Sequence, residues 1–271
     1  MVVFPNCKIN LGLHILRKRG DGFHDLETVF YPVALQDALE IITNTAGDGP
    51  VLHPSGLVID GRPEDNICTK AYGLLKADFP LLPPVHLHLH KVIPAGAGLG
   101  GGSADGAFTL LALNRKYRLG LTEEQLLRYA LQLGSDCPFF IHNKPCLARG
   151  RGEEFEAIGL DLSAFKVLLV NPKIHVNTGW AFSQLQPTDQ RPSLKEVVES
   201  PVATWQNRLE NDFEGPIFSK FPEIAALKAQ LYALGALYAS MSGSGSTVYG
   251  LFPKEQPLSP SFPAHYFVRE C

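Results

Sequence analysis

Hydrophobic and polar residues alternate in several stretches of the first half of the chain, and this period of two predicts strands. The predicted strands cover residues 2–16, 29–35, 38–43, 52–59 and 85–92, and a buried strand is expected at 165–170. In the first of them Lys8 and Asn10 share a face, because side chains two positions apart on a strand point the same way. Residues 17–24, rich in charge and glycine, predict a loop.

Apolar residues spaced three or four positions apart predict helices elsewhere. Helices are expected in this way at residues 66–79 and 223–234. Thr122 and Gln125 have the spacing of a capping box, so the helix that they begin should end at Gly134. Proline clusters predict loops at residues 187–201 and 253–263.

The composition is that of a globular protein. Of 271 residues, 45% are hydrophobic and 19% are charged, which excludes a disordered or fibrous chain. A formal net charge of -3 argues against a nucleic-acid scaffold, because such proteins need a basic surface. Five scattered cysteines form neither a disulfide framework nor a zinc motif. We expect a cytoplasmic location, with neither a leader nor a membrane span.

The most informative segment is the glycine-rich stretch from Pro94 to Ser103. Its five glycines separate a predicted strand from a helix that is expected to begin near Ser103, which is a natural N-cap. Glycines allow backbone N–H groups to turn inward, and a helix N-terminus adds further N–H groups and the positive end of its dipole. The segment therefore predicts a site for a polyphosphate, with a plain glycine-rich turn as the alternative.

Two common phosphate loops do not fit this segment. A Walker A motif requires lysine after its last glycine, whereas Gly102 is followed directly by Ser103. Gly96, Gly98 and Gly101 satisfy the GxGxxG pattern of dinucleotide-binding folds. That fold also needs an acidic residue at the end of the next strand, and a second helix follows here instead.

Four segments in chain order carry a resemblance to a known family. They are Lys8-Ile9-Asn10-Leu11-Gly12-Leu13, Arg19-Gly20-Asp21-Gly22-Phe23-His24, the glycine loop with Ser103-Ala104-Asp105, and Leu133-Gly134-Ser135-Asp136-Cys137-Pro138-Phe139-Phe140. Together they resemble the superfamily of galactokinase, homoserine kinase, mevalonate kinase and phosphomevalonate kinase (GHMP kinases). The likeness is greatest to its branch that acts on a cytidine diphosphate-linked methylerythritol.

The resemblance implies an α/β (α+β) fold of two domains. These are an N-terminal ribosomal-protein-S5-domain-2-like domain at residues 1–155 and a C-terminal ferredoxin-like domain at 156–271. It also implies the use of ATP and Mg²⁺ to phosphorylate the 2-hydroxyl of 4-diphosphocytidyl-2-C-methyl-D-erythritol in isoprenoid biosynthesis. The expected partner is thus a small-molecule substrate, without nucleic acid or membrane, and the oligomeric state is left open. A mevalonate or homoserine kinase and a non-catalytic ATP-binding protein remain alternatives.

The family's site residues are carried over position by position. Lys8 and Asp136 match its catalytic pair. Substrate contacts are expected from Asn10, Phe23, His24, Thr178 and Phe182. Nucleotide contacts are expected from Asn66, Lys91, Pro94, Gly96, Gly98, Leu99, Gly100, Gly101, Gly102, Ser103, Gly243 and Ser244. Phe23 stands where the family usually has tyrosine, which keeps a stacking face but loses a phenol hydrogen bond. The metal ligands are not assigned.

This chemistry needs positioning more than basicity, because phosphoryl transfer passes through a loose transition state. Asp136 is expected to orient the hydroxyl and to accept its proton late, since an ordinary aspartate is a weak base toward an alcohol. Lys8 is expected to keep Asp136 ionised and to stabilise the transferring group. His86, His88 and His90 alternate on one strand and are interpreted as a polar face, with a metal site as the alternative.

Overall fold

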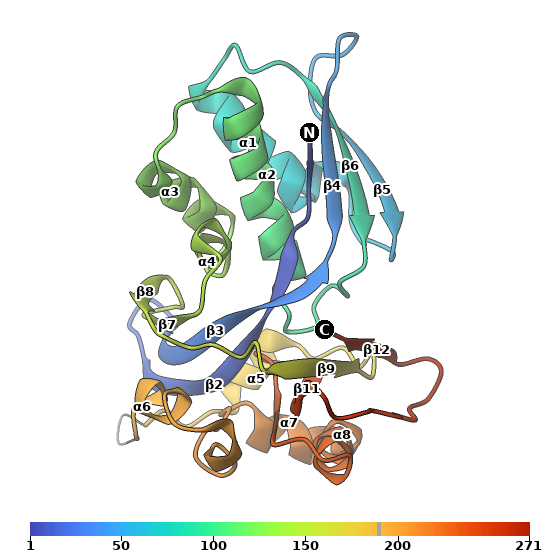
Figure 1. Ribbon diagram of the computed structural model, residues 1–271. Helices are drawn as coiled ribbons and strands as arrows, with labels where there is room; N and C mark the ends of the chain where they lie inside the picture. Colours follow the sequence, from blue (N-terminus) through green and yellow to red (C-terminus); the bar gives the residue numbers. More distant parts are fainter. Residues whose placement is uncertain (189–190) are drawn as a thin grey trace. The chain divides into compact units, whose positions relative to one another are not determined.

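The computed structural model describes residues 1–188 and 191–271 (Figure 1). The chain forms two compact units, and each is discontinuous in sequence. Unit 1 contains Met1–Cys7, Ala34–Ala95 and Gly100–Lys144, and unit 2 contains Lys8–Val33, Gly96–Leu99 and Pro145–Cys271. The glycine-rich loop therefore contributes residues to both units. The division into domains at residues 1–155 and 156–271 stays a prediction.

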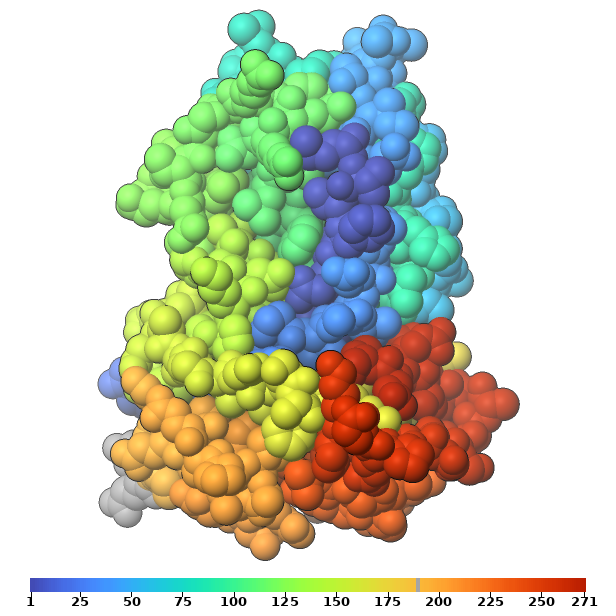
Figure 2. All heavy atoms as spheres, in the orientation of Figure 1, coloured from blue at the N-terminus to red at the C-terminus, as the bar shows by residue number. Residues whose placement is uncertain are grey.

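Unit 1 contains a four-stranded sheet in the order β1-β4-β6-β5. Its strands are β1 (Val2–Val3), β4 (Ala38–Thr43), β6 (Val85–Lys91) and β5 (Val51–Gly56). β4 is antiparallel to β1 and β6, whereas β5 is parallel to β6. The first residues of the chain, dark blue in Figure 2, lie on the surface, and Val2 and Phe4 are more than half exposed.

Helices cover one face of this sheet (Figure 1). They are η1 (Pro63–Asp65), α1 (Ile67–Asp78), α2 (Gly101–Tyr117), α3 (Glu123–Leu133) and α4 (Cys137–His142). Along β6, Val85, Leu87 and Leu89 are buried in the core with side chains of α1, α2 and α3. His88 and His90 alternate with them and are exposed, which confirms the polar strand face.

Two further four-stranded sheets lie in unit 2, except that residues 6–7 and 34–36 of the first sheet belong to unit 1. One has the order β2-β3-β7-β8, formed by β2 (Asn6–Lys18), β3 (His24–Gln36), β7 (Cys146–Arg149) and β8 (Glu154–Ala157). The other has the order β10-β11-β9-β12, formed by β10 (Tyr238–Met241), β11 (Val248–Pro253), β9 (Phe165–Asn171) and β12 (Phe267–Glu270). The strands of the second sheet are antiparallel to their neighbours.

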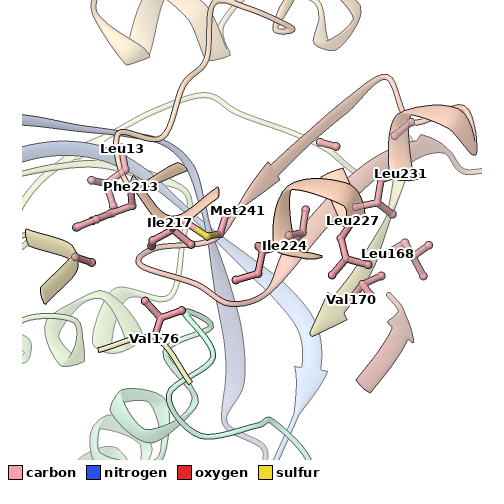
Figure 3. Packing of buried hydrophobic residues seen from close by; sticks show 14 of the residues in the cluster. Leu13, Leu168, Val170, Val176, Phe213, Ile217, Ile224, Leu227, Leu231 and Met241 are labelled. Atoms are coloured by element: carbon pink, nitrogen blue, oxygen red, sulfur yellow. The ribbon is translucent and has the colours of Figure 1, made fainter. Parts of the chain in front are cut away.

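The helices of unit 2 are α5 (Thr178–Ser183), α6 (Leu194–Val198), η2 (Val202–Thr204), α7 (Glu214–Lys220) and α8 (Pro222–Ala233). Ile217 of α7 and Leu227 of α8 pack with Met241 and Val170 of the second sheet in one apolar cluster (Figure 3). Leu13 of β2 joins the same cluster, so the strand that carries Lys8 and Asn10 is anchored in this core.

Most sequence-predicted elements are confirmed, and three are corrected. The first strand is interrupted at Phe4 and Pro5, and the strand expected at 52–59 ends at Gly56. The proline-rich stretch 187–201 contains α6, although positions 189–190 lie outside the described residues. The capping box of Thr122 and Gln125 is present. Among the described residues, no helix is both long and apolar enough to cross a membrane.

Candidate active site

The glycine-rich loop links β6 to α2 and turns through three left-handed glycines. Gly96, Gly98 and Gly100 have φ values of +64°, +79° and +70°, a region that favours glycine. Gly100 is the N-cap of α2, so the prediction that Ser103 has this role is wrong. The left-handed turn at Gly100 starts the helix earlier, and Ser103 becomes its third residue. The first N–H groups of α2 consequently belong to glycines, whose backbone a ligand can approach closely.

A second small-residue loop, residues 242–247, packs against the glycine-rich loop within unit 2. Ser242 Oγ donates to Gly98 O (2.8 Å), and Thr247 N–H donates to Ala97 O (3.2 Å). The fit is close, because a Cβ on Gly98 would lie 2.0 Å from Ser242 O. Asn211 Nδ2 donates to the carbonyls of Met241 and Gly243, both at 2.8 Å. The two loops therefore pack into one surface whose shape is set mainly by their backbones.

Lys8 lies buried on β2 beside Asn10, as the period of the strand predicts. Lys8 Nζ donates to Asn10 Oδ1 (2.5 Å) and lies 4.9 Å from the centre of the Phe30 ring. Asn10 Nδ2 donates to Thr28 Oγ1 (2.9 Å), and Asn10 N–H donates to Ser242 Oγ (3.2 Å). Ser242 thus connects the strand that carries Lys8 to the glycine-rich loop.

Asp136 lies in unit 1, at the N-cap position of α4, and is half-buried. Its neighbour Cys137 is buried, and burial raises the pKa of the Cys137 thiol to about 12. The Ser103 side chain lies near that thiol and lowers its pKa slightly, and α2 packs against α4. The end of the glycine-rich loop and the residue next to Asp136 are therefore in contact. Because Lys8 belongs to unit 2, its pairing with Asp136 stays a prediction.

An aromatic group lies at the start of β3 in unit 2. The rings of His24 and Phe182 are stacked with centroids 5.0 Å apart, and Phe182 also meets Phe213 edge to face. Burial, with the charge of Lys18, lowers the pKa of His24, so the neutral imidazole is favoured. Phe23 is 53% exposed, and the guanidinium of Arg151 lies 5.0 Å from its ring centre. Two of the residues expected to contact the substrate, His24 and Phe182, therefore lie together, and their binding of cytosine stays a prediction.

Three other predicted residues have polar partners in the structure. Thr178 Oγ1 and Ser244 Oγ lie 3.1 Å apart, which brings together one predicted substrate residue and one predicted nucleotide residue. Asn66 is the N-cap of α1, where its Oδ1 accepts from Cys68 N–H (2.9 Å). The side chain of Asn66 thus has a structural role as a helix cap.

Lys91 is buried between two carboxylates of unit 1. Its ammonium is paired with Asp37 and with Asp105, the latter at 2.6 Å. Burial raises the pKa of Asp105 to about 7, although the nearby charge of Lys91 opposes this shift. The polar network around the loop also includes Thr28, Asp37 and Asn211, which the sequence reasoning missed. They lie outside the segments that carry the family resemblance.

Comparisons with known proteins identify the family of this chain. The family model described as "GHMP kinases N terminal domain" matches residues 66–144, and "GHMP kinases C terminal" matches residues 190–259. A 4-diphosphocytidyl-2-C-methyl-D-erythritol kinase from Bacteroides fragilis (strain YCH46) is 53% identical over 260 residues, covering 96% of this chain and 94% of its own. The enzyme of the same name from Azobacteroides pseudotrichonymphae is 48% identical over 271 residues, covering 99% and 100%.

A solved structure supports the same assignment. The crystal structure of a 4-(cytidine 5'-diphospho)-2C-methyl-D-erythritol kinase is 33% identical and has a TM-score of 0.78. The match covers 93% of this chain and 90% of that one. The prediction of a two-domain GHMP kinase fold is thereby confirmed.

Proposed function

Because the chain belongs to the GHMP kinase family, among the 4-diphosphocytidyl-2-C-methyl-D-erythritol kinases, we propose that it phosphorylates the 2-hydroxyl of this cytidine compound with ATP. The observation that carries the proposal is 53% identity to a relative of that name across 96% of the chain. The chain is a small-molecule kinase, and its reaction belongs to isoprenoid biosynthesis.

The ATP phosphates bind to the backbone of residues Pro94 to Ser103. Three left-handed glycines and the N-terminus of α2 supply N–H groups, and Gly243 and Ser244 lie in the loop that packs against Gly98. Phosphate oxygens accept hydrogen bonds from these N–H groups. The loop can therefore bind phosphates although it lacks the lysine of a Walker A motif. Asn66, which caps α1 in unit 1, also contributes to the nucleotide site.

Lys8 stabilises negative charge on the transferring phosphoryl group. The residue is only 3% exposed, and its ammonium is oriented by Asn10 Oδ1. A positive charge away from bulk water acts more strongly on an anionic transition state than an exposed one does. Asn10 thus has a positioning role toward Lys8 besides its proposed role toward the substrate.

Asp136 orients the substrate hydroxyl and accepts its proton as the P–O bond forms. The half-buried carboxylate lies next to Cys137, which contacts Ser103 at the end of the phosphate loop. Orientation of the alcohol accounts for most of its contribution, because the transition state is loose and little basicity is needed.

The cytidine end of the substrate binds at His24, Phe23 and Phe182. The stacked rings of His24 and Phe182 offer aromatic faces to a base, and a neutral imidazole has one donor and one acceptor for the cytosine edge. Thr178, beside Ser244, contributes a hydroxyl to the substrate.

Magnesium fits the oxygen donors that unit 1 provides. The Ser103 hydroxyl and the Asp136 carboxylate are hard ligands on neighbouring elements, and Mg²⁺ commonly takes only one or two protein ligands beside substrate phosphates. When bound, the ion would neutralise charge on the β- and γ-phosphates.

We further propose a cytoplasmic location, where the reducing environment suits five free cysteines.

The test is an ADP-release assay with the cytidine substrate, mevalonate and homoserine offered separately. Turnover of only the cytidine compound is expected, whereas turnover of another alcohol in its place would move the chain to a sister kinase.

Asp136→Asn is expected to lower kcat about 1,000-fold while leaving the Kd of an ATP analogue within about twofold. Asp48→Asn, in an exposed turn, serves as the control. Full activity of Asp136→Asn would exclude the role given to this carboxylate.

A further inference from the structure

A buried ion cluster in unit 1 joins three side chains from different parts of the chain. Lys91, the last residue of β6, is paired with Asp37, which precedes β4, and with Asp105 on α2. The side chains are 6%, 0% and 3% exposed, respectively. The cluster is therefore closed to solvent, and its charges act within the protein.

Asp37 fixes the chain where it enters the glycine-rich loop. One oxygen, Oδ1, accepts from the backbone N–H groups of Val92 (2.6 Å) and Ile93 (2.9 Å), the two residues before Pro94. The other oxygen is paired with Lys91. Hydrogen bonds to a carboxylate are shorter and stronger than those between neutral groups, and two of them from adjacent residues give this end of the loop a defined orientation.

Asp105 fixes the chain where it leaves the loop. It lies in the second turn of α2, and its Oδ2 accepts from Lys91 Nζ (2.6 Å). The start of α2 also packs tightly here, because a Cβ on Gly101 would lie 2.7 Å from Ile93 Cγ2 and 3.5 Å from Lys91 Nζ. Both ends of the loop thus meet at one ammonium group.

The cluster is a costly way to obtain stability alone. Asp105 Oδ1 is buried and has no hydrogen-bond partner among residues 1–188 and 191–271. Apolar side chains of similar volume usually stabilise a core as well as buried ions do. An apolar core could not form the hydrogen bonds and ion pairs that hold both ends of the loop.

We infer that Asp37, Lys91 and Asp105 are positioning residues for ATP, which hold the two ends of the phosphate loop at the spacing that the triphosphate needs. This inference rests on the proposed kinase function. Lys91 then acts through the loop, because its buried ammonium is committed to two carboxylates. Loss of the link at Asp105 should weaken ATP binding and leave the cytidine site unchanged.

The experiment measures the Kd of a non-hydrolysable ATP analogue by calorimetry, together with the Tm and steady-state kinetics of each full-length variant. Asp105→Leu removes the link to α2, and Asp105→Asn keeps an acceptor for Lys91. We expect Kd and the KM for ATP to rise about 30-fold in Asp105→Leu and about 5-fold in Asp105→Asn. The kcat at saturating ATP and the KM for the cytidine substrate should stay within about twofold.

Leu75→Ala is the matched control, because Leu75 is fully buried in the core of unit 1. It should lower Tm without changing the Kd of the analogue. The inference would be wrong if Asp105→Asn bound ATP as tightly as wild type, or if Leu75→Ala and Asp105→Leu lost ATP affinity equally. The cluster would then contribute only to stability. If Asp105→Leu does not fold, Asp105→Asn decides. Wild-type protein that binds the analogue but phosphorylates no alcohol contradicts only the proposed function, whereas failure to bind it contradicts both.

Discussion

The glycine-rich loop and the aromatic group around His24 are built by different means. The loop is defined by backbone, with left-handed glycines, ends fixed by buried ions and contacts to Ser242 that leave no room for a side chain. The aromatic group is defined by side chains, and its Phe23 is 53% exposed. A phosphate has the same shape in every nucleotide, so a rigid backbone suits it, whereas a base is distinguished by its ring and edge.

This difference predicts two kinds of response to mutation. Changes in the loop act through geometry, because an added atom must displace buried backbone. Changes in the aromatic group act through chemistry, so related side chains should give graded effects. Loop variants should therefore show large losses toward ATP, and aromatic variants should show smaller losses toward the cytidine substrate.

Within the loop and the aromatic group, the largest effect is expected for Gly98→Ala. A Cβ at this position would lie 2.0 Å from Ser242 O, and φ is +79°, which by itself costs an alanine about 1–2 kcal/mol. Displacement of the loop should lower kcat/KM for ATP about 100-fold, measured in the ADP-release assay. Gly73→Ala is the control, since Gly73 lies on the exposed side of α1 with open space around it. Similar kinetics in both variants would show that the loop tolerates displacement.

The sequence predicted features of the fold and the site that depend on neighbouring residues better than features that depend on residues far apart in the chain. The capping box of Thr122 and the alternation along β6 are local, and both predictions are confirmed. The N-cap at Ser103 was wrong because glycine at position 100 adopts a left-handed turn that local preference alone does not specify. The pairing of Lys91 with Asp37, 54 positions away, depends on tertiary structure.

The short helices show the same limit. α4 and α6, with six and five residues, are too short to be stable alone, so their sequence periodicity is weak. Leu194, Val197 and Val198 of α6 are buried, and tertiary packing therefore determines that helix within a stretch that its prolines marked as a loop. By contrast, the assignment of His24 and Phe182 to the substrate followed from a family resemblance, and their stacking on each other could not be obtained from spacing.

Phe182→Leu tests the aromatic side of the comparison. Leucine keeps most of the apolar contact with the core of unit 2 but removes the ring that stacks on His24. Stacking of a base on an aromatic ring contributes about 1–3 kcal/mol, so the KM for the cytidine substrate should rise about 10-fold. The KM for ATP should not change. Phe218→Leu, in the same core, controls for lost packing. If Phe182→Leu raised the KM for ATP as much as the KM for the cytidine substrate, the aromatic group and the glycine-rich loop would not bind separate ligands.

Acidification should have a reversible effect on the same group, and just below pH 6.5 this effect should be smaller than that of Phe182→Leu. Burial lowers the pKa of His24 below 6.5, so the imidazole is neutral at pH 7 and becomes charged only as pH falls through the lowered value. The KM for the cytidine substrate should be constant from about pH 8 to 6.5 and then rise about 10-fold per pH unit once His24 is protonated. His24→Gln should lose this dependence. A KM that changes above pH 7 would assign the titration to another group.

The smallest effect is expected for Phe23→Tyr, which introduces the residue that the family resemblance leads us to expect at this position. The ring is half exposed, so an added hydroxyl meets solvent and requires no repacking. The guanidinium of Arg151, 5.0 Å from the ring centre, interacts with phenol as well as with phenyl, and an exposed contact of this kind contributes about 0.5–1 kcal/mol. The KM for the cytidine substrate should therefore change by less than about threefold in Phe23→Tyr, whereas Phe23→Leu, which loses the aromatic face, should raise it about fivefold. A large gain in Phe23→Tyr would mean that the phenol hydroxyl binds substrate directly and that this region depends on a specific hydrogen bond more than on stacking.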